Sequence, residues 1–375
     1  MTPAEIDVLK KIFTVNLSVK KDEQVLVFSD TIRDDEEISS DERARRLGIN
    51  AIARAVADEG KAFCGIKHIE LPSVHGHGYE PREELWIDAF GQECVDELKQ
   101  NDLFENILSK KINIDNLRDT EVIIINFAKP PAAIIALSNF STSHTRFRDF
   151  LTRCLRARYA SMPLFERGML TGAMSADWNE VHARTMRIIE KLKGADMVYL
   201  TSRNGTSISF SIKGRVVLPD TGLITERGSF SNLPAGEAFV APVEGTANGT
   251  LILEYAPTRK LHAPISLEVK NGLVTGVDGS DPFAETLKKN LAKNKLVGNI
   301  AELGIGTNDK ATRPDNILET EKILGTVHIA LGDNSSFGGK VRIPYHEDFI
   351  FFKPTLEAIK GEEKVEILIE GENRF

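Results

Sequence analysis

The chain has 375 residues, of which 41% are hydrophobic and 27% charged, and its net charge of −8 corresponds to a pI of about 5.6. This is the composition of a globular protein long enough to form two hydrophobic cores. The acidic balance argues against nucleic acid or an anionic membrane as the main partner, because both attract basic proteins. No apolar run approaches the roughly 18–20 residues of a membrane span. Three widely spaced cysteines and the absence of a signal-peptide pattern predict a cytoplasmic protein.

The first half of the chain alternates short apolar runs with amphipathic patterns. The predicted strands are 23–30, 62–71 and 121–128, and the predicted helices are 39–60, 143–157 and 175–193. The run EVIIINFA at 121–128 gives the clearest of these strand patterns. Strands that alternate with helices favour a mostly parallel sheet covered by helices on its faces.

After Gly194 the pattern changes to short β-rich runs separated by glycines, with one further helix predicted at 281–295. Asn271-Gly272, between two alternating runs, predicts a two-residue hairpin turn. We therefore expect an α+β protein of two domains. The N-terminal α/β domain spans residues 1–194, and the β-rich C-terminal domain, which carries the candidate metal site, spans 195–375.

Two histidines and an aspartate stand out in HIALGDNSSFGGKVRIPYHEDF, residues 328–349. His328 alternates with apolar neighbours in a predicted strand, so it faces away from the core. His346 and Asp348 are two residues apart and share one face of a second predicted strand. An imidazole and a carboxylate presented in this way suit a divalent ion. The alternative is an exposed loop with a capping aspartate and a hydrogen-bonded histidine.

Two glutamates in apolar surroundings extend this set. Glu302 lies within LVGNIAELGIG, and Glu237 follows Pro-Ala-Gly at the start of a predicted strand. A lone buried carboxylate is costly unless it is paired or bound to a metal. With His328, His346 and Asp348, these glutamates would make five ligands, enough for two divalent ions that share a bridging water. Taken singly, each glutamate also fits a salt bridge or a strand end.

Several motifs in order carry a family resemblance: NLPAGEAFVAPVEGTANGT, AELGIGTN, ILETEKILGTVHIALGDN and HED. Over residues 172–355 the chain resembles the aminopeptidase T / aminopeptidase S family of metallopeptidases. The resemblance implies a metalloaminopeptidase that removes N-terminal amino acids from peptide substrates. It also implies a homodimer and two divalent metal ions, with Zn, Co, Mn or Mg as candidates. The ligands that it implies are Glu237, Glu302, His328, His346 and Asp348.

The sequence departs from that family around the first histidine. Family members have a longer segment between the two histidine-bearing strands and a tyrosine shortly after the first histidine. Here that region reads GDNSSFGG, which leaves Tyr345 as the candidate catalytic tyrosine. On an ideal strand Tyr345 would face away from His346 and Asp348. Glu319 and Glu321, near His328 in sequence, fit a solvated helix or turn.

A second class of function uses fewer ligands. His328, His346 and Asp348 alone satisfy the two-histidine, one-carboxylate set of mononuclear Fe(II) oxygenases. A ring-cleaving dioxygenase of dihydroxypyridines is similar to the same family. The presence of Glu237 and Glu302 favours the two-metal hydrolase, because a mononuclear oxygenase has no use for the extra negative charge. A metal-binding homologue without peptidase activity is the third alternative.

Overall fold

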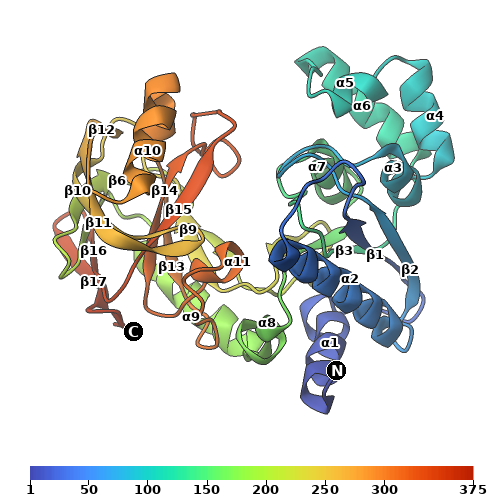
Figure 1. Ribbon diagram of the computed structural model, residues 1–375, viewed down its shortest axis with the longest axis horizontal. Coiled ribbons are helices and arrows are strands. Elements are labelled where there is room, and N and C mark those ends of the chain that lie inside the picture. The colour runs from blue at the N-terminus through green and yellow to red at the C-terminus, as the bar shows by residue number, and fades with distance from the viewer. Residues whose placement is uncertain (375) are drawn as a thin grey trace. The chain divides into compact units, whose positions relative to one another are not determined.

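The computed structural model describes residues 1–374. Packing divides the chain into two compact units, one formed by Met1–Ser175 with Gly222–Pro234 and the other by Ala176–Thr221 with Ala235–Phe375. The predicted mixture of a parallel α/β part and a β-rich part is confirmed (Figure 1). The boundary predicted near residue 195 stays a prediction about how the chain divides into domains. Within residues 1–374, no helix is both long and apolar enough to cross a membrane.

The first unit is built on a parallel sheet with the strand order β2-β1-β3-β4-β8. Its elements are α1 (Pro3–Lys11), η1 (Ile12–Asn16), β1 (Gln24–Thr31), α2 (Ser40–Gly60), β2 (Gly65–Pro72), α3 (Glu83–Phe90), α4 (Gln92–Gln100), α5 (Phe104–Leu108), α6 (Ile114–Phe127), β3 (Ala133–Ala136), α7 (Arg146–Asp149), η2 (Phe150–Cys154), β4 (Arg158–Ser161), α8 (Gly168–Thr171), η3 (Ala173–Ser175) and β8 (Phe230–Asn232). Helix α2 packs against β1 and β2 (Figure 1). Leu26 and Phe28 of β1 join the apolar core formed with helices α3 to α6. Helices therefore pack against the sheet, as the alternating pattern predicts.

The strand predicted at 121–128 is wrong, because these residues belong to α6. The β-branched run favours a strand locally, but the longer segment has helical spacing: Thr120 and Ile124 are buried, whereas Val122 and Ile125 are exposed. The side chain of Asn113 accepts a hydrogen bond from the backbone N–H of Asn116 and caps the helix. The strand of this region is β3, a few residues further along the chain.

The second unit contains two antiparallel sheets, with the orders β12-β11-β10-β6-β5-β16-β17-β18 and β15-β14-β13-β9-β7. Its elements are α9 (Trp178–Leu192), β5 (Met197–Thr201), β6 (Ser207–Ser211), β7 (Leu218–Asp220), β9 (Glu237–Val240), β10 (Asn248–Ala256), β11 (Arg259–Lys270), β12 (Leu273–Asp278), α10 (Pro282–Lys293), η4 (Lys295–Gly298), β13 (Ile300–Gly306), α11 (Ile317–Thr320), β14 (Val327–Gly332), β15 (His346–Phe351), β16 (Thr355–Lys360), β17 (Glu363–Ile369) and β18 (Glu372–Asn373). The predicted Asn271-Gly272 hairpin is confirmed, with φ of 48° and 79° at the turn.

One apolar core joins the two sheets of the second unit. From the shorter sheet it takes Leu303 and Ile305 of β13 and Val327 and Ile329 of β14, which pack with residues of β5, β6, β10 and β11. Alternation along the strands then turns the intervening residues to the opposite face of the shorter sheet. That second face carries the polar residues of interest.

Candidate metal centre

Adjacent strands of the shorter sheet bring the predicted ligands together. Glu237 begins β9, Glu302 lies in β13, His328 in β14, and His346 and Asp348 in β15. The register pairs Ala330 with both Glu302 and Asp348, and His328 lies two residues before Ala330. Because paired residues point to the same side of a sheet, these ligands share the face away from the core.

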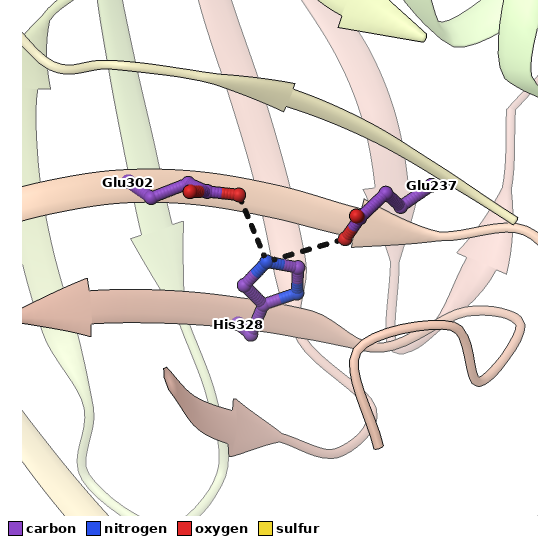
Figure 2. Close-up of side chains that lie close together, drawn as sticks. All are labelled: Glu237, Glu302 and His328. Carbon is purple, nitrogen blue, oxygen red and sulfur yellow. Dashed lines mark hydrogen bonds and ion pairs between the residues drawn. The ribbon is translucent and has the colours of Figure 1, made fainter. Parts of the chain in front are cut away.

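The imidazole of His328 lies between two carboxylates (Figure 2). Its Nε2 is 3.4 Å from Glu302 Oε1 and 3.4 Å from Glu237 Oε2. Only 1% of the His328 side chain is exposed, so water does not screen these charges. These three residues form one of two groups of ligand atoms within residues 1–374 that are close enough to hold an ion.

The second group shares Glu302 with the first. His346 Nε2 lies 3.6 Å from Glu302 Oε2 and 3.5 Å from Asp348 Oδ1. Asp348 Oδ1 is also 4.0 Å from His328 Nε2, so it faces both imidazoles. The structure therefore brings together all five residues that the sequence predicts as metal ligands.

The ring of His346 is oriented by the backbone. Its Nδ1 lies 2.8 Å from the carbonyl oxygen of Asp333, so Nδ1 donates and Nε2 faces the carboxylates. A hydrogen bond from the second ring nitrogen to a carbonyl is the usual support of a metal-binding histidine. Phe337 packs edge-on against the His346 ring, with the centroids 6.0 Å apart.

His328 depends on a glycine in the neighbouring strand. Gly304 pairs with His328 in the register of β13 and β14. A Cβ atom at residue 304 would collide with Cε1 and Nε2 of the His328 ring. The ring thus lies directly over the backbone of β13, and any residue other than glycine at position 304 would exclude it from this place. Nδ1 of His328 is buried and has no hydrogen-bond partner among residues 1–374.

The carboxylates govern the protonation of both histidines. Burial opposes the charge on His328, but its hydrogen bond to Glu302 and the charges of Glu237 and Asp348 outweigh burial and raise its pKa to about 9. Asp348 and Glu302 likewise raise the pKa of His346 to about 10, against the effect of burial. Burial opposes the charge on Asp348 as well, but the two histidines hold its pKa well below the usual range. An arriving metal ion must displace protons from both imidazoles.

A buried lysine, which the sequence interpretation missed, completes the cluster. Lys322 Nζ is fully buried and lies 2.6 Å from Glu237 Oε1, 2.7 Å from Glu321 Oε2 and 3.5 Å from Asp220 Oδ2. Burial opposes its charge, but these carboxylates raise the pKa of Lys322 well above its ordinary value. Burial raises the pKa of Glu237 to about 7 and that of Glu321 to about 8.

The prediction that Glu319 and Glu321 are solvated is wrong. Glu319 is 2% exposed and accepts backbone hydrogen bonds from Thr312 and Arg313, and the Glu321 side chain is 17% exposed. In the sequence, Glu-Thr-Glu-Lys has the polarity of a surface helix, and nothing local signals its burial. A signal did exist in the apolar residues on both sides, ILETEKILGTVHIALG.

The charge of this cluster fits a cation. The cluster contains five carboxyl groups (Asp220, Glu237, Glu302, Glu321 and Asp348) against one ammonium group and two imidazoles. Glu237 Oε2 and Asp348 Oδ1 are buried and accept no hydrogen bond from the described residues. Buried carboxylates of this kind are normally paired or bound to a metal. Oxygen and imidazole ligands suit a divalent transition-metal ion.

Tyr345 lies on the other side of the strand. Its hydroxyl donates to Glu347 Oε2 at 2.6 Å, and its ring packs against the apolar core. Burial raises the pKa of this hydroxyl far above its usual range. The catalytic role of Tyr345 stays a prediction.

The chain combines an α/β unit with a β-rich unit that gathers histidines and carboxylates on one face of a sheet. The family model described as NicX, 2,5-dihydroxypyridine 5,6-dioxygenase, matches residues 135–366, which is more than half of the chain. The chain belongs to this family.

A curated relative carries the same description. The 2,5-dihydroxypyridine 5,6-dioxygenase of Pseudomonas putida KT2440 is 26% identical over 173 residues, which are 42% of this chain and 49% of the relative. The match thus spans about half the length of that relative.

Two solved structures share the fold. The dihydroxypyridine dioxygenase of Pseudomonas putida KT2440 aligns over 99% of this chain and 96% of its own, with a TM-score of 0.68 and 17% identity. AmpT from Thermus thermophilus aligns over 99% of both chains, with a TM-score of 0.54 and 11% identity. The resemblance to aminopeptidase T is therefore one of fold.

The family match corrects the predicted activity. The predictions of a metalloaminopeptidase, and of peptides as its substrates, are wrong, because the family model and the curated relative both describe a dioxygenase. The sequence interpretation used Glu237 and Glu302 to choose the hydrolase over the oxygenase, and the family match contradicts that choice. It counted their negative charges without the buried ammonium of Lys322.

Proposed function

We propose that this chain is an iron-dependent dioxygenase that opens the ring of a dihydroxypyridine. The observation that carries the proposal is the convergence of His328, His346 and Asp348, with each imidazole Nε2 within 4.0 Å of Asp348 Oδ1. Two histidines and one carboxylate are the ligands of mononuclear ferrous oxygenases. The family description and the curated relative support the substrate class.

The spacing suits one ion. Two ligand atoms at right angles, each about 2.1 Å from an ion, lie roughly 3 Å apart. The separations of 3.5 and 4.0 Å need only a small inward movement of the side chains.

One Fe(II) takes the place of the two Zn, Co, Mn or Mg ions that the peptidase resemblance implies. Direct ligation by Glu237 and Glu302 stays a prediction, as do the homodimer and the cytoplasmic location.

A bound ferrous ion supplies the redox chemistry that dioxygen requires. The protein supplies the surroundings. Glu302 holds its oxygens 3.4 and 3.6 Å from the two imidazoles, within reach of a hydroxyl group presented there, and accepts its proton. Asp333 keeps the Nε2 atom of His346 directed at the site through its carbonyl oxygen.

An aromatic wall favours a flat ring as substrate. Phe337 lies edge-on to His346, and Phe239 lies edge-on to Phe337 with the centroids 5.7 Å apart. Edge-to-face and offset stacking stabilise aromatic pairs by about 0.5–1.5 kcal/mol. The segment that carries Phe337 is held in place because Asn334 is fully buried and donates to Glu244 Oε1 at 3.0 Å.

The test is oxygen consumption by protein loaded anaerobically with Fe(II). With 2,5-dihydroxypyridine we expect one O₂ consumed per substrate lost, and no turnover by His346→Ala. His262→Ala is the matched control, because His262 is exposed in β11 and belongs to neither group of ligand atoms. Bound iron without oxygen uptake would support the metal-binding homologue without this activity and would contradict the proposal.

A further inference from the structure

Lys322 lies against Glu237, one of the predicted ligands of the second ion. We propose that this lysine is the permanent cation of the corner formed by Asp220, Glu237 and Glu321, and that it limits the site to one divalent ion. The inference rests on the proposed function and adds to it the residue that sets the number of ions.

The ammonium group occupies one oxygen of a predicted metal ligand. Nζ of Lys322 lies 2.6 Å from Glu237 Oε1, and the side chain is completely buried. The backbone fixes its position: the N–H of Lys322 donates to the carbonyl of Glu319 at 3.0 Å, and its carbonyl accepts from the N–H of Asn308 at 2.9 Å. Lys322 therefore reaches Glu237 from a turn held on both sides.

The charges make the two ligand groups unequal. An ion held by Glu237, Glu302 and His328 would bind the Oε2 side of the carboxylate whose Oε1 already holds an ammonium group. Two like charges on one carboxylate repel each other, and burial weakens the screening of that repulsion. The group at Asp348 is different, because Asp348 faces the two imidazoles and, among residues 1–374, forms no ion pair with a lysine or arginine.

The number of ions separates two kinds of chemistry on this fold. A pair of ions about 3.5–4 Å apart activates a bridging water for hydrolysis. A single ferrous ion with two histidines and a carboxylate leaves open positions for oxygen and substrate. By placing its charge on the other oxygen of Glu237, Lys322 favours the single-ion state, and Glu237 becomes its counter-ion instead of a ligand.

The test is the stoichiometry of metal binding, measured on the full chain by equilibrium dialysis against Mn(II) and elemental analysis. We expect about one ion per chain for the unsubstituted protein and about two for Lys322→Met, which keeps the length of the side chain and removes its charge. Lys340→Met is the matched control, since Lys340 is exposed in the neighbouring loop, and it should bind one ion. Two ions in the unsubstituted protein, or one in a folded Lys322→Met, would overturn the inference.

A second variant keeps the inference testable if Lys322→Met does not fold. The glutamine of Glu237→Gln still has a side-chain oxygen to which Lys322 can donate. We expect this variant to keep one bound Mn(II), with its affinity changed less than about threefold. Loss of the ion from Glu237→Gln would show Glu237 to be a ligand and would overturn the inference. Failure of the unsubstituted protein to bind any ion would instead overturn the proposed function.

Discussion

Two clusters of buried acids, one in each unit, are satisfied in different ways. In the first unit, both oxygens of Asp30 accept backbone N–H groups, from Asn139 at 2.6 Å and Phe140 at 3.1 Å. Glu80 accepts from Arg146 and Phe147 in the same manner. In the second unit, Glu237 Oε2 and Asp348 Oδ1 have no hydrogen-bond donor among the described residues.

The difference separates a structural cluster from a binding site. Glu36 of the first unit shows the structural case: it is 9% exposed, pairs with Arg33 at 2.8 Å and with Arg46, and accepts a hydrogen bond from Ser73. A cluster whose acids are already paired has nothing left for a ligand. The acids around His328 outnumber their partners, and a cation from outside makes up the difference.

The largest effect is expected from removing a metal ligand from the cluster around His328 in the second unit. Asp348→Asn keeps the shape of the side chain but loses the charge that faces both histidines. We expect Fe(II) or Mn(II) affinity to fall more than about 100-fold, since even outer partners of metal ligands contribute about 10–100-fold. Competition with a chelating dye measures this affinity. An unchanged affinity would remove Asp348 from the ligand set.

Substitutions in the Glu36 cluster of the first unit should change the free energy of unfolding and not the metal affinity. Arg46→Met leaves Glu36 buried with only part of its charge compensated, and we expect a loss of about 3 kcal/mol in unfolding free energy. Urea unfolding followed by circular dichroism measures it. Metal affinity should stay within about twofold of the unsubstituted protein. A large loss of metal affinity at constant stability would contradict the purely structural role of the Glu36 cluster.

Glu80 gives a pH dependence that belongs to the first unit. Burial raises its pKa to about 7 in the folded protein, against the lowering by its two backbone donors. The folded state then holds a proton that the unfolded state has released, so stability falls as the pH rises from about 4.5 to 7. We expect a loss of about 2 kcal/mol over that range, and less in Glu80→Gln, which cannot ionise. Unfolding at pH 5 and pH 8 measures it, and equal slopes for both proteins would contradict the assignment.

The smallest effect is expected at Gly304. Gly304→Ala forces the His328 ring off the backbone of β13, and we expect about a tenfold loss in metal affinity. Gly48→Ala in α2 is the matched control, since a Cβ there meets nothing within 4 Å. The control should leave metal affinity unchanged and stabilise the helix by about 0.5–1 kcal/mol. Equal affinities for both variants would mean that His328 can bind from another position.

Local patterns predicted the parts of the site that lie along single strands. Alternation around His328, and between His346 and Asp348, predicted which face each residue takes. The pairing of Ala330 with Asp348, which brings the two strands into register, is long-range and has no local signal. Helix α6 shows the converse, because its β-branched run is locally strand-like and only the longer spacing and the Asn113 cap favour a helix.

Lys322 shows why the chemistry was harder to predict than the ligands. A lysine after Glu-Thr-Glu has the pattern of a solvated surface, and its burial depends on Asp220 and Glu237, far away in sequence. Because the sequence interpretation did not include that ammonium group, the negative charges of the glutamates favoured a second metal ion. The ligand residues could thus be proposed from the sequence, whereas the balance of charge among them required the folded chain.

The segment between β14 and β15 has consequences for how such a protein can diversify. Both of its ends are fixed by the sheet, through the pairing of Gly332 with His346 and the hydrogen bond that the His346 ring donates to the Asp333 carbonyl. Exposed residues between these ends, such as Ser336 and Lys340, can be exchanged without altering the spacing of the strands that carry His328 and Asp348. Since Phe337 belongs to this segment, substitutions there would reshape the aromatic wall of the proposed substrate site, while the sheet keeps the geometry of the ligands.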